Sequence, residues 1–179
     1  CDSNADIFVA DGVIHCGKCG NYAIPTDKIK LLGIHNHYNI AAAHFITKPF
    51  VSDEQFTSAI CSFDPLAHRL EYVGVFSGIR WYDDSISTAC ATAVEAVKSV
   101  PDCETILIGG MDRGIDYTPL VEFLSKSSVN VICMETSGKR IYEMISAADF
   151  NKKERVHFAT HLEQAVSLAA EITPQGKSC

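Results

Sequence analysis

Short apolar runs and helical stretches alternate regularly after residue 100, and this alternation limits the chain to few folds. The runs at residues 105–108, 129–134 and 155–158 have the length and apolar character of buried strands. Between and after them, apolar residues recur at helical spacing, which predicts three helices, at residues 119–125, 139–148 and 162–172. A βαβα order of this kind builds a mostly parallel sheet with helices on both faces, so the sequence predicts a Rossmann-like α/β fold.

Residues 70–76 and 79–82 form two further β-prone runs, separated by Ser77-Gly78 and followed by a predicted helix over 88–99. The first 65 residues have a different organisation. Two apolar runs flank Asp11-Gly12, which favours a tight hairpin turn, and helices are predicted over 39–47 and from Ser52 to residue 63.

Asp64-Pro65 interrupts the helical pattern and marks a boundary between two parts of the chain. We therefore predict a short α+β piece over 1–65 and the α/β unit over 66–179. The chain begins without Met and finishes after a helical stretch with no closing strand, from which we expect a fragment of a longer protein.

Charge and hydropathy exclude several classes of function. The net charge of -7, from 15 Lys+Arg against 22 Asp+Glu, leaves no basic stripe for a nucleic acid. No apolar run approaches the roughly 20 residues that cross a bilayer, and the start lacks the pattern of a secretion signal, so we expect a cytoplasmic protein with no membrane partner. Cys61, Cys90, Cys103 and Cys133 lie in apolar runs, which favours reduced core thiols.

Ligands of parallel α/β sheets bind at the carboxyl ends of the strands, which directs attention to the loops 83–87 and 109–116. Asp83, Asp84 and Ser85 could hold a nucleotide or Mg²⁺. Alternatively, Asp84, Ser85 or Ser87 caps the following helix, and we expect that one of them does. In the glycine-rich second loop, Arg113 could clamp a carboxylate, or it could form a plain exposed Arg-Asp pair.

Other candidates carry weaker signals. Asn36 and Asn39 lie three residues apart where a helix begins and could read an adenine edge, unless Asn36 is only the helix cap. Arg69 precedes a strand and could contact phosphate or ribose oxygens, or be solvated. Cys16 and Cys19 have zinc-knuckle spacing, but a closed site needs four ligands and no second CxxC occurs, so free thiols are the default.

Taken in order, these segments resemble the Mur ligase family, most closely its D-glutamate-adding member. Residues 33–43 resemble the family's G-x-H-N-x-x-N-x-x-A-A segment, and residues 66–71 its L-x-H-R-x-E element. Residues 84–92 are similar to its D-S-K-A-T-N-x-x-A-T stretch, and residues 109–116 to its G-G-x-x-K-G-x-D loop. The chain departs from this pattern at Ile86, Ala89 and Arg113, where the family has lysine, asparagine and lysine.

The resemblance implies the roles of these residues. Asn36, Asn39, Arg69 and Asp84 would contact ATP, whereas Ser85, Thr88 and Arg113 would hold the carboxylates of D-glutamate. In the family, ATP phosphorylates UDP-N-acetylmuramoyl-L-alanine, the D-glutamate amine attacks the acyl phosphate, and an amide forms.

The family's phosphate loop, Mg²⁺ ligands and carbamylated lysine would lie before Cys1, since no GxxxxGK[ST] sequence occurs here. The resemblance thus implies no catalytic residue and no metal ligand in this chain. We expect a monomer that is inactive alone.

Three alternatives remain open at this point. The first is a non-catalytic Mur-like subunit that is paired with an amidotransferase and carries a zinc ribbon, which Cys16 and Cys19 would fit. The second is a generic Rossmann-like nucleotide-binding domain, although the loop after residue 108 is not G-x-G-x-x-G. The third is another amino-acid specificity, since other Mur ligases and folylpolyglutamate synthases share the architecture.

Overall fold

The computed structural model describes residues 7–16, 22–147 and 153–179, and the chain divides into two compact units. The N-terminal unit comprises residues 1–66 and the C-terminal unit residues 67–179, a division one residue after the expected boundary. Each unit has its own hydrophobic core.

The N-terminal unit contains a three-stranded antiparallel sheet with the order β1-β2-β3, made of β1 (Ile7–Ala10), β2 (Val13–Cys16) and β3 (Tyr22–Pro25). Asp11 and Gly12 both have positive φ, as a two-residue hairpin turn between twisted strands requires, and the predicted hairpin is confirmed. The sequence analysis missed β3. A short 3-10 helix, η1 (Thr26–Lys28), follows it.

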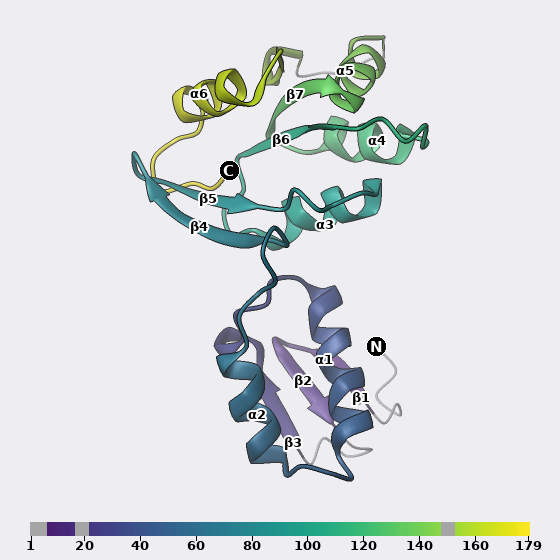
Figure 1. Ribbon diagram of the computed structural model, residues 1–179, viewed down its shortest axis with the longest axis vertical. Coiled ribbons are helices and arrows are strands. Elements are labelled where there is room, and N and C mark those ends of the chain that lie inside the picture. The colour runs from purple at the N-terminus through teal and green to yellow at the C-terminus, as the bar shows by residue number, and fades with distance from the viewer. Residues whose placement is uncertain (1–6, 17–21, 148–152) are drawn as a thin grey trace. The chain divides into compact units, whose positions relative to one another are not determined.

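Two helices, α1 (Ile34–Thr47) and α2 (Asp53–Ser62), complete this unit (Figure 1). Ile14, Ile24 and Phe56 are among the buried residues that join the helices to the sheet. The buried His44 of α1 makes a 2.7 Å hydrogen bond through Nε2 to Asp53, the first residue of α2. Ser52 caps α2 in a capping box with Gln55, and the predicted start of this helix at Ser52 is confirmed.

The C-terminal unit is built on a parallel sheet with the order β6-β7-β8, made of β6 (Thr105–Gly110), β7 (Asn130–Thr136) and β8 (Val156–Ala159). The central strand is buried on both faces, because Val131, Ile132 and Cys133 are all fully buried. Strands covered on both sides read as continuous apolar runs, which is the signal that the sequence carried. A 3-10 turn, η2 (Lys153–Arg155), precedes β8.

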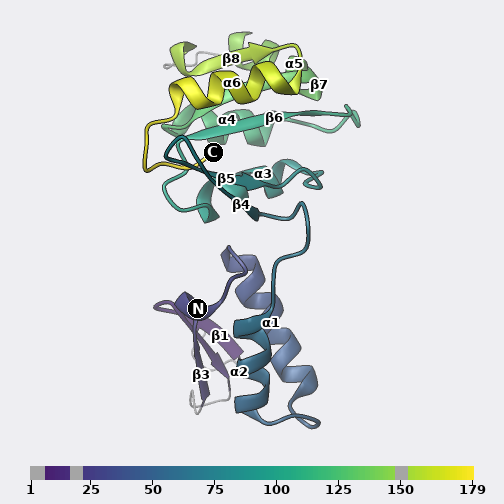
Figure 2. The ribbon, with the colours of Figure 1, turned by 60° about the vertical axis from the view of Figure 1, so that its left-hand side comes forward.

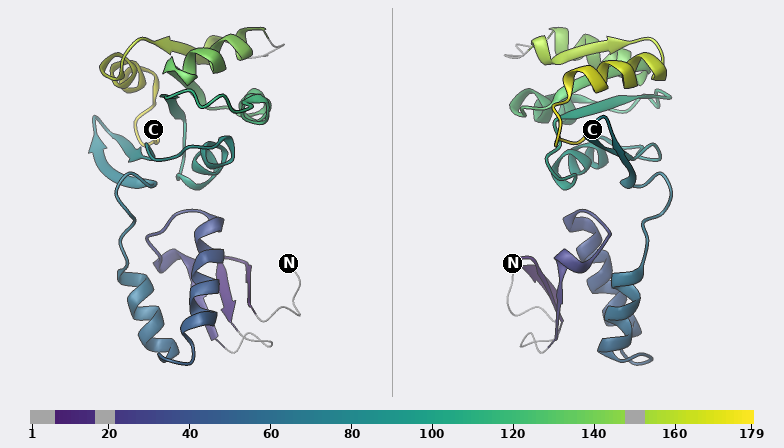
Figure 3. Two further views of the ribbon diagram at one scale, coloured as in Figure 1. Left: turned by 45° about the vertical axis from the view of Figure 1, so that its right-hand side comes forward. Right: turned by 90° about the vertical axis from the view of Figure 1, so that its left-hand side faces the viewer.

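Helices cover both faces of this sheet, so the predicted Rossmann-like fold is confirmed. On the face of Val131 and Cys133 lie α3 (Cys90–Ser99), α4 (Thr118–Lys126) and α5 (Ser137–Ala147). On the opposite face, Ala165 and Ala169 of α6 (Leu162–Ile172) pack against Ile132. Figures 2 and 3 show α6 on one side of the strands and the other three helices across from it.

An antiparallel hairpin, β4 (Glu71–Phe76) and β5 (Ile79–Asp83), joins this sheet through residues 177–179 (Figure 1). The amide of Arg80 donates to the Lys177 carbonyl at 3.0 Å, and the amide of Ser178 donates to the Asp102 carbonyl at 3.0 Å. Residues 177–179 thus run between β5 and the start of β6. Ser178 pairs with Arg80 and Cys103 only through isolated bridges, so residues 173–179 contain no regular strand, in agreement with the sequence.

The described cysteines Cys61, Cys90, Cys103 and Cys133 are free thiols, as expected. Burial raises the pKa of Cys133 to about 12, which keeps this thiol protonated. Cys19 and the side chain of Cys16 lie outside the described residues, so the zinc interpretation stays a prediction. Across the described helices, none combines the length and apolarity needed to cross a membrane.

Candidate functional site

The carboxyl ends of β5, β6, β7 and β8 surround a cavity of about 900 Å³ in the C-terminal unit. Both loops that the sequence singled out contribute to its wall, the first through residues such as Asp84 and the second through Arg113. Glu135, Thr160 and His161 also line it and were missed by sequence reasoning. Glu135 lies at the carboxyl end of β7, and Thr160 and His161 directly follow β8. These positions were the available signal, since ligands gather at the carboxyl ends of all strands in such a sheet.

Two carboxylates of the first loop hold the turn that precedes β4. The Asp83 carboxylate makes a 2.7 Å hydrogen bond through Oδ2 to Nδ1 of His68, and Asp84 Oδ1 accepts from the Leu70 amide at 3.1 Å. His68 and Leu70 both have positive φ, which side chains other than glycine rarely adopt. The two aspartates therefore stabilise an unfavourable backbone turn, in addition to facing the cavity.

The hydrogen bond between His68 and Asp83 shifts the pKa of both side chains. Together with the charge of Asp83, it raises the pKa of His68, and the same bond lowers the pKa of Asp83. Glu71 Oε2 accepts from the His68 amide at 2.8 Å, which brings one ligand atom from each of the three residues within 4.8 Å of one another. Because these groups already bond each other, the cluster is satisfied without a cation.

The expected cap of α3 was wrong. This helix begins at Cys90 with Ala89 as its N-cap, so none of Asp84, Ser85 and Ser87 caps it. The Ala89 side chain has no acceptor. The Ala89 amide donates to the Thr92 hydroxyl at 3.3 Å, and this hydroxyl donates to the Ala89 carbonyl at 2.6 Å. Ser85 and Thr88 are instead exposed on the wall of the cavity, and the Ser85 amide donates to Asp83 Oδ1 at 2.8 Å.

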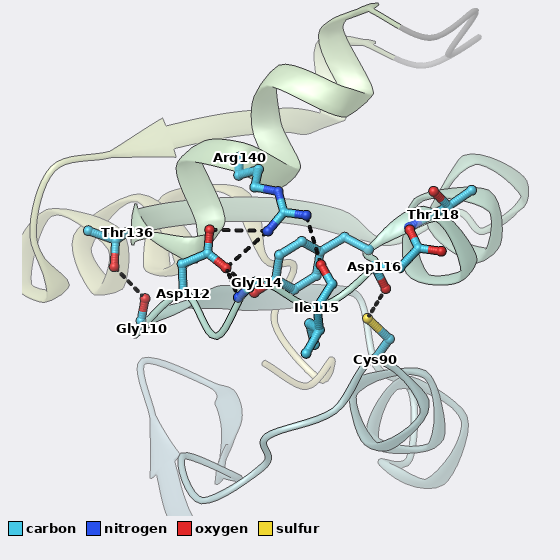
Figure 4. Close-up of polar contacts among 10 residues, drawn as sticks. Cys90, Gly110, Asp112, Gly114, Ile115, Asp116, Thr118, Thr136 and Arg140 are labelled. Atoms are coloured by element: carbon cyan, nitrogen blue, oxygen red, sulfur yellow. Dashed lines mark hydrogen bonds and ion pairs between the residues drawn. The ribbon is translucent and has the colours of Figure 1, made fainter.

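The second loop, residues 110–116, is held by Arg140 from the first half of α5 (Figure 4). Arg140 Nη1 contacts both carboxylate oxygens of Asp112, at 3.1 and 3.2 Å, and its Nη2 donates to the Ile115 carbonyl at 2.8 Å. The guanidinium also lies over the Tyr117 ring, 4.9 Å from its centroid. One arginine thereby fixes the middle of the loop by three polar contacts and a cation–π contact.

Asp112 is paired with Arg140 and not with Arg113, so the plain Arg-Asp pair considered for this loop does not form. A hydrogen bond from the Gly114 amide, supported by the contact with Arg140, lowers the pKa of Asp112 and favours its charged form. Arg113 is exposed and makes no hydrogen bond or ion pair with other described residues. It is the one lysine or arginine among the described residues that line the cavity.

The close approach of β6 and β7 below this loop depends on a missing side chain. A Cβ on Gly109 would lie 2.7 Å from Cβ of Met134, which is too close for any other residue. Beyond it, the Thr136 hydroxyl donates to the Gly110 carbonyl at 2.8 Å and fastens the start of the loop (Figure 4). Packing therefore explains Gly109, whereas Gly110 is explained by its positive φ of 119°.

The remaining predicted nucleotide-binding residues lie on both units. Asn36 and Asn39 belong to the first turns of α1 in the N-terminal unit, and Asn36 donates to the Leu32 carbonyl at 2.7 Å. Gly33 is the N-cap of that helix, so Asn36 does not cap it. Asn39 is exposed, and so is Arg69, which lies in the C-terminal unit with Asp84.

Comparisons with known proteins agree on one family. A UDP-N-acetylmuramoylalanine--D-glutamate ligase of Pelobacter propionicus is 32% identical over 175 residues, which is 95% of this chain and 37% of that protein. A UDP-N-acetylmuramoyl-L-alanine--L-glutamate ligase of Salinispora tropica is 33% identical over 158 residues, 85% of this chain and 35% of that protein. The chain thus spans little more than a third of these relatives. No protein-family model matches it.

Solved structures show the same fold at lower identity. The UDP-N-acetylmuramate-alanine ligase MurC of Thermotoga maritima matches 92% of the chain with a TM-score of 0.68 and 15% identity, over 37% of its own chain. A folylpolyglutamate synthase of Mycobacterium tuberculosis, solved with ADP, matches 96% of the chain with a TM-score of 0.64 and 14% identity, over 42% of its own chain.

The described residues therefore have a fold that occurs in a class of ligases and synthases, which includes MurC and a folylpolyglutamate synthase. Within that class, the curated relatives decide the family, since they cover most of the chain at about 32% identity. The chain belongs to the Mur ligase family.

Proposed function

We propose that this protein takes part in the ATP-dependent ligation of glutamate to UDP-N-acetylmuramoyl-L-alanine in peptidoglycan precursor synthesis, and that the cavity of the C-terminal unit receives the glutamate. The names of the relatives support the reaction. The observation that supports the location is Arg113, an unpaired cation on a cavity wall at the carboxyl ends of the strands.

The chemistry of the wall suits a dicarboxylate. A guanidinium can bind a carboxylate through two parallel N–H donors, so Arg113 would orient one carboxylate of glutamate. Ser85 and Thr88, across the cavity wall on the first loop, would donate hydroxyl hydrogen bonds to the same ligand. Held at its carboxylates, glutamate would present its amine for attack on the activated acceptor.

We propose nucleotide-binding roles for Asn36 and Asn39 in the N-terminal unit and for Arg69 and Asp84 in the C-terminal unit. The side chains of Asn39 and Arg69 are exposed, which fits contacts to the base, ribose or phosphates of ATP. When bound, ATP would supply the phosphoryl group that activates the acceptor carboxylate. In agreement with the resemblance, we assign no Mg²⁺ ligand within the described part of the chain.

The configuration of the glutamate is a separate question, because the relatives differ. The Pelobacter propionicus relative is a D-glutamate ligase, whereas the Salinispora tropica relative is an L-glutamate ligase with a similar sequence identity to this chain. We propose D-glutamate as the substrate, in agreement with the resemblance of residues 84–92 and 109–116, and keep L-glutamate as the second candidate.

Titration of the 179-residue protein with each glutamate enantiomer, followed by NMR, tests this proposal. We expect D-glutamate to shift the amides of residues 84–88 and 110–116, and Arg113→Met to weaken its binding at least about tenfold, the value of a lost charged hydrogen bond. Lys126→Met at the end of α4 is the matched control and should change nothing. Equal affinity of wild type and Arg113→Met would contradict the proposed site, and preference for L-glutamate would favour the second candidate.

A further inference from the structure

We infer that Arg140 is a positioning residue for the amino-acid site, which holds loop 110–116 in place and leaves Arg113 free for the carboxylate of the ligand. This inference rests on the proposed function of the cavity. It concerns a residue on α5, outside every segment in which the sequence placed a ligand contact.

The loop needs an external support because its own backbone is permissive. Gly110 and Gly114 both have positive φ, and a Cβ on either would meet open space, so the chain does not pack against a neighbour at these points. The ends of the loop are tied by the Thr136 hydroxyl on Gly110 and by the Cys90 thiol, which donates to the Asp116 carbonyl at 3.3 Å. Between these ties, Arg140 binds Asp112 and Ile115 from one side (Figure 4).

The charges of the loop give Arg140 a second effect. Asp112 precedes Arg113 directly, and an unpaired carboxylate there would compete with the ligand for Arg113 or repel the ligand's own carboxylate. Arg140 contacts both oxygens of Asp112, while the Gly114 amide donates to Oδ1 at 2.9 Å. Asp112 is thus occupied, and the positive charge of Arg113 remains available to the cavity.

A purely structural role predicts a different result. The Arg140 side chain is 40% exposed, and ion pairs near the surface contribute little to stability. Loss of its contacts should therefore affect the position and charge of the loop more than the melting temperature of the unit. Measurements of glutamate binding and of thermal stability therefore distinguish a positioning role of Arg140 from a purely structural one.

The experiment compares wild type with Arg140→Met, Arg140→Lys, Asp112→Asn/Arg140→Met and Arg113→Met, using glutamate affinity, amide hydrogen exchange of Gly114 and thermal unfolding. We expect Arg140→Met to weaken glutamate binding about tenfold and to speed Gly114 exchange. Arg140→Lys keeps the positive charge but lacks the two parallel N–H donors of a guanidinium. Its glutamate affinity and Gly114 exchange rate should therefore lie between those of wild type and Arg140→Met. The double variant should regain part of the affinity, because the unpaired carboxylate is gone.

Each outcome decides the inference. If Arg113→Met loses binding while Arg140→Met binds as wild type does, Arg140 has no positioning role and the proposed function survives. If wild type shows no glutamate binding, or Arg113→Met changes nothing, the proposed function fails first, and this inference with it. Unchanged Gly114 exchange in Arg140→Met overturns the positioning role whatever the affinities. Should Arg140→Met unfold, Arg140→Lys with wild-type affinity and exchange overturns it equally.

Discussion

Two residues with left-handed backbone stand before β4, and the side chains of Asp83 and Asp84 hold them there. His68 and Leu70 have φ values of 63° and 45°, a conformation that costs a side-chain-bearing residue on the order of 1 kcal/mol or more. The bonds from Asp83 to the His68 ring and from Asp84 to the Leu70 amide offset this cost. The first of these bonds involves two titratable groups, so the stability of this turn depends on pH.

We predict that His68 stabilises the C-terminal unit mainly in a mildly acidic window. Since its pKa is raised above 6.5, its contribution is complete below that value and is lost as the pH rises through the shifted pKa. The lowered pKa of Asp83 means that its contribution is present above 3.8 and is lost on further acidification. The melting temperatures of wild type and His68→Gln should therefore differ more near pH 5.5 than near pH 9.

The matched control for this prediction is the same comparison in an Asp83→Asn background, where the pH dependence should largely disappear. A difference between wild type and His68→Gln that stays constant from pH 5 to 9 would contradict it. NMR titration of the His68 ring in both backgrounds gives the pKa directly.

Sequence reasoning reached some residues of the site and not others, for a physical reason. Asp84 and Ser85 closely follow one apolar run, and Arg113 lies in the glycine-rich loop after another. The rule that ligands gather at the carboxyl ends of strands was therefore enough to select them. Arg140 lies 28 residues from Asp112, on the surface of a helix where arginines are common. Its role follows from tertiary contact alone, which no local pattern encodes.

At the scale of secondary-structure elements, a helix start was easier to predict where the N-cap residue has a side-chain acceptor. The start of α2 was predicted correctly because Ser52 and Gln55 form a capping box. The starts of α1 and α3 were misplaced because their N-caps, Gly33 and Ala89, offer no side-chain acceptor. The three strands of the parallel sheet and α6 were found within a few residues, since burial imposes a strong apolar pattern on them.

Ala89→Asn should stabilise the C-terminal unit by about 1 kcal/mol, the usual gain when alanine at an N-cap is replaced by asparagine. Ala89 already has the extended backbone of an N-cap, so the new carbonyl oxygen can accept from the free amides of α3 without rearrangement. Asparagine is also what the family resemblance predicts here. Urea denaturation measures the change in the free energy of unfolding.

Ala91→Asn, two residues further on the exposed side of α3, is the control for this prediction. There the same substitution introduces a poor helix former and should be neutral or destabilising. If both variants changed stability alike, capping would not be the cause.

At the scale of the whole C-terminal unit, residues 177–179 connect the β4–β5 hairpin to the parallel sheet. Ser178 is fully buried, and its Oγ accepts from Arg80 Nε at 3.0 Å and donates to the Pro101 carbonyl. A single buried hydroxyl thus bridges the Arg80 side chain and the Pro101 carbonyl, which also contact each other through Arg80 Nη2 at 3.4 Å. The sequence could not predict this connection, because it joins positions 98 residues apart through three residues.

We predict that Ser178→Ala lowers the free energy of unfolding by about 1–3 kcal/mol, since it removes the two hydrogen bonds that this buried hydroxyl makes. Ser125→Ala is the control, because its hydroxyl bonds only within the exposed side of α4 and its loss should cost little. Equal stability of Ser178→Ala and wild type in urea denaturation would show that water replaces the hydroxyl.

The place of residues 177–179 between β5 and β6 also has a consequence for biosynthesis. A ribosome releases the β4–β5 hairpin early, yet the backbone groups along the free edge of β5 find their neighbours only when residues made 98 positions later emerge. During that interval the edge can pair with any extended chain nearby. The nascent protein is therefore most exposed to misassembly, and most dependent on chaperones, between the translation of Arg80 and that of Ser178.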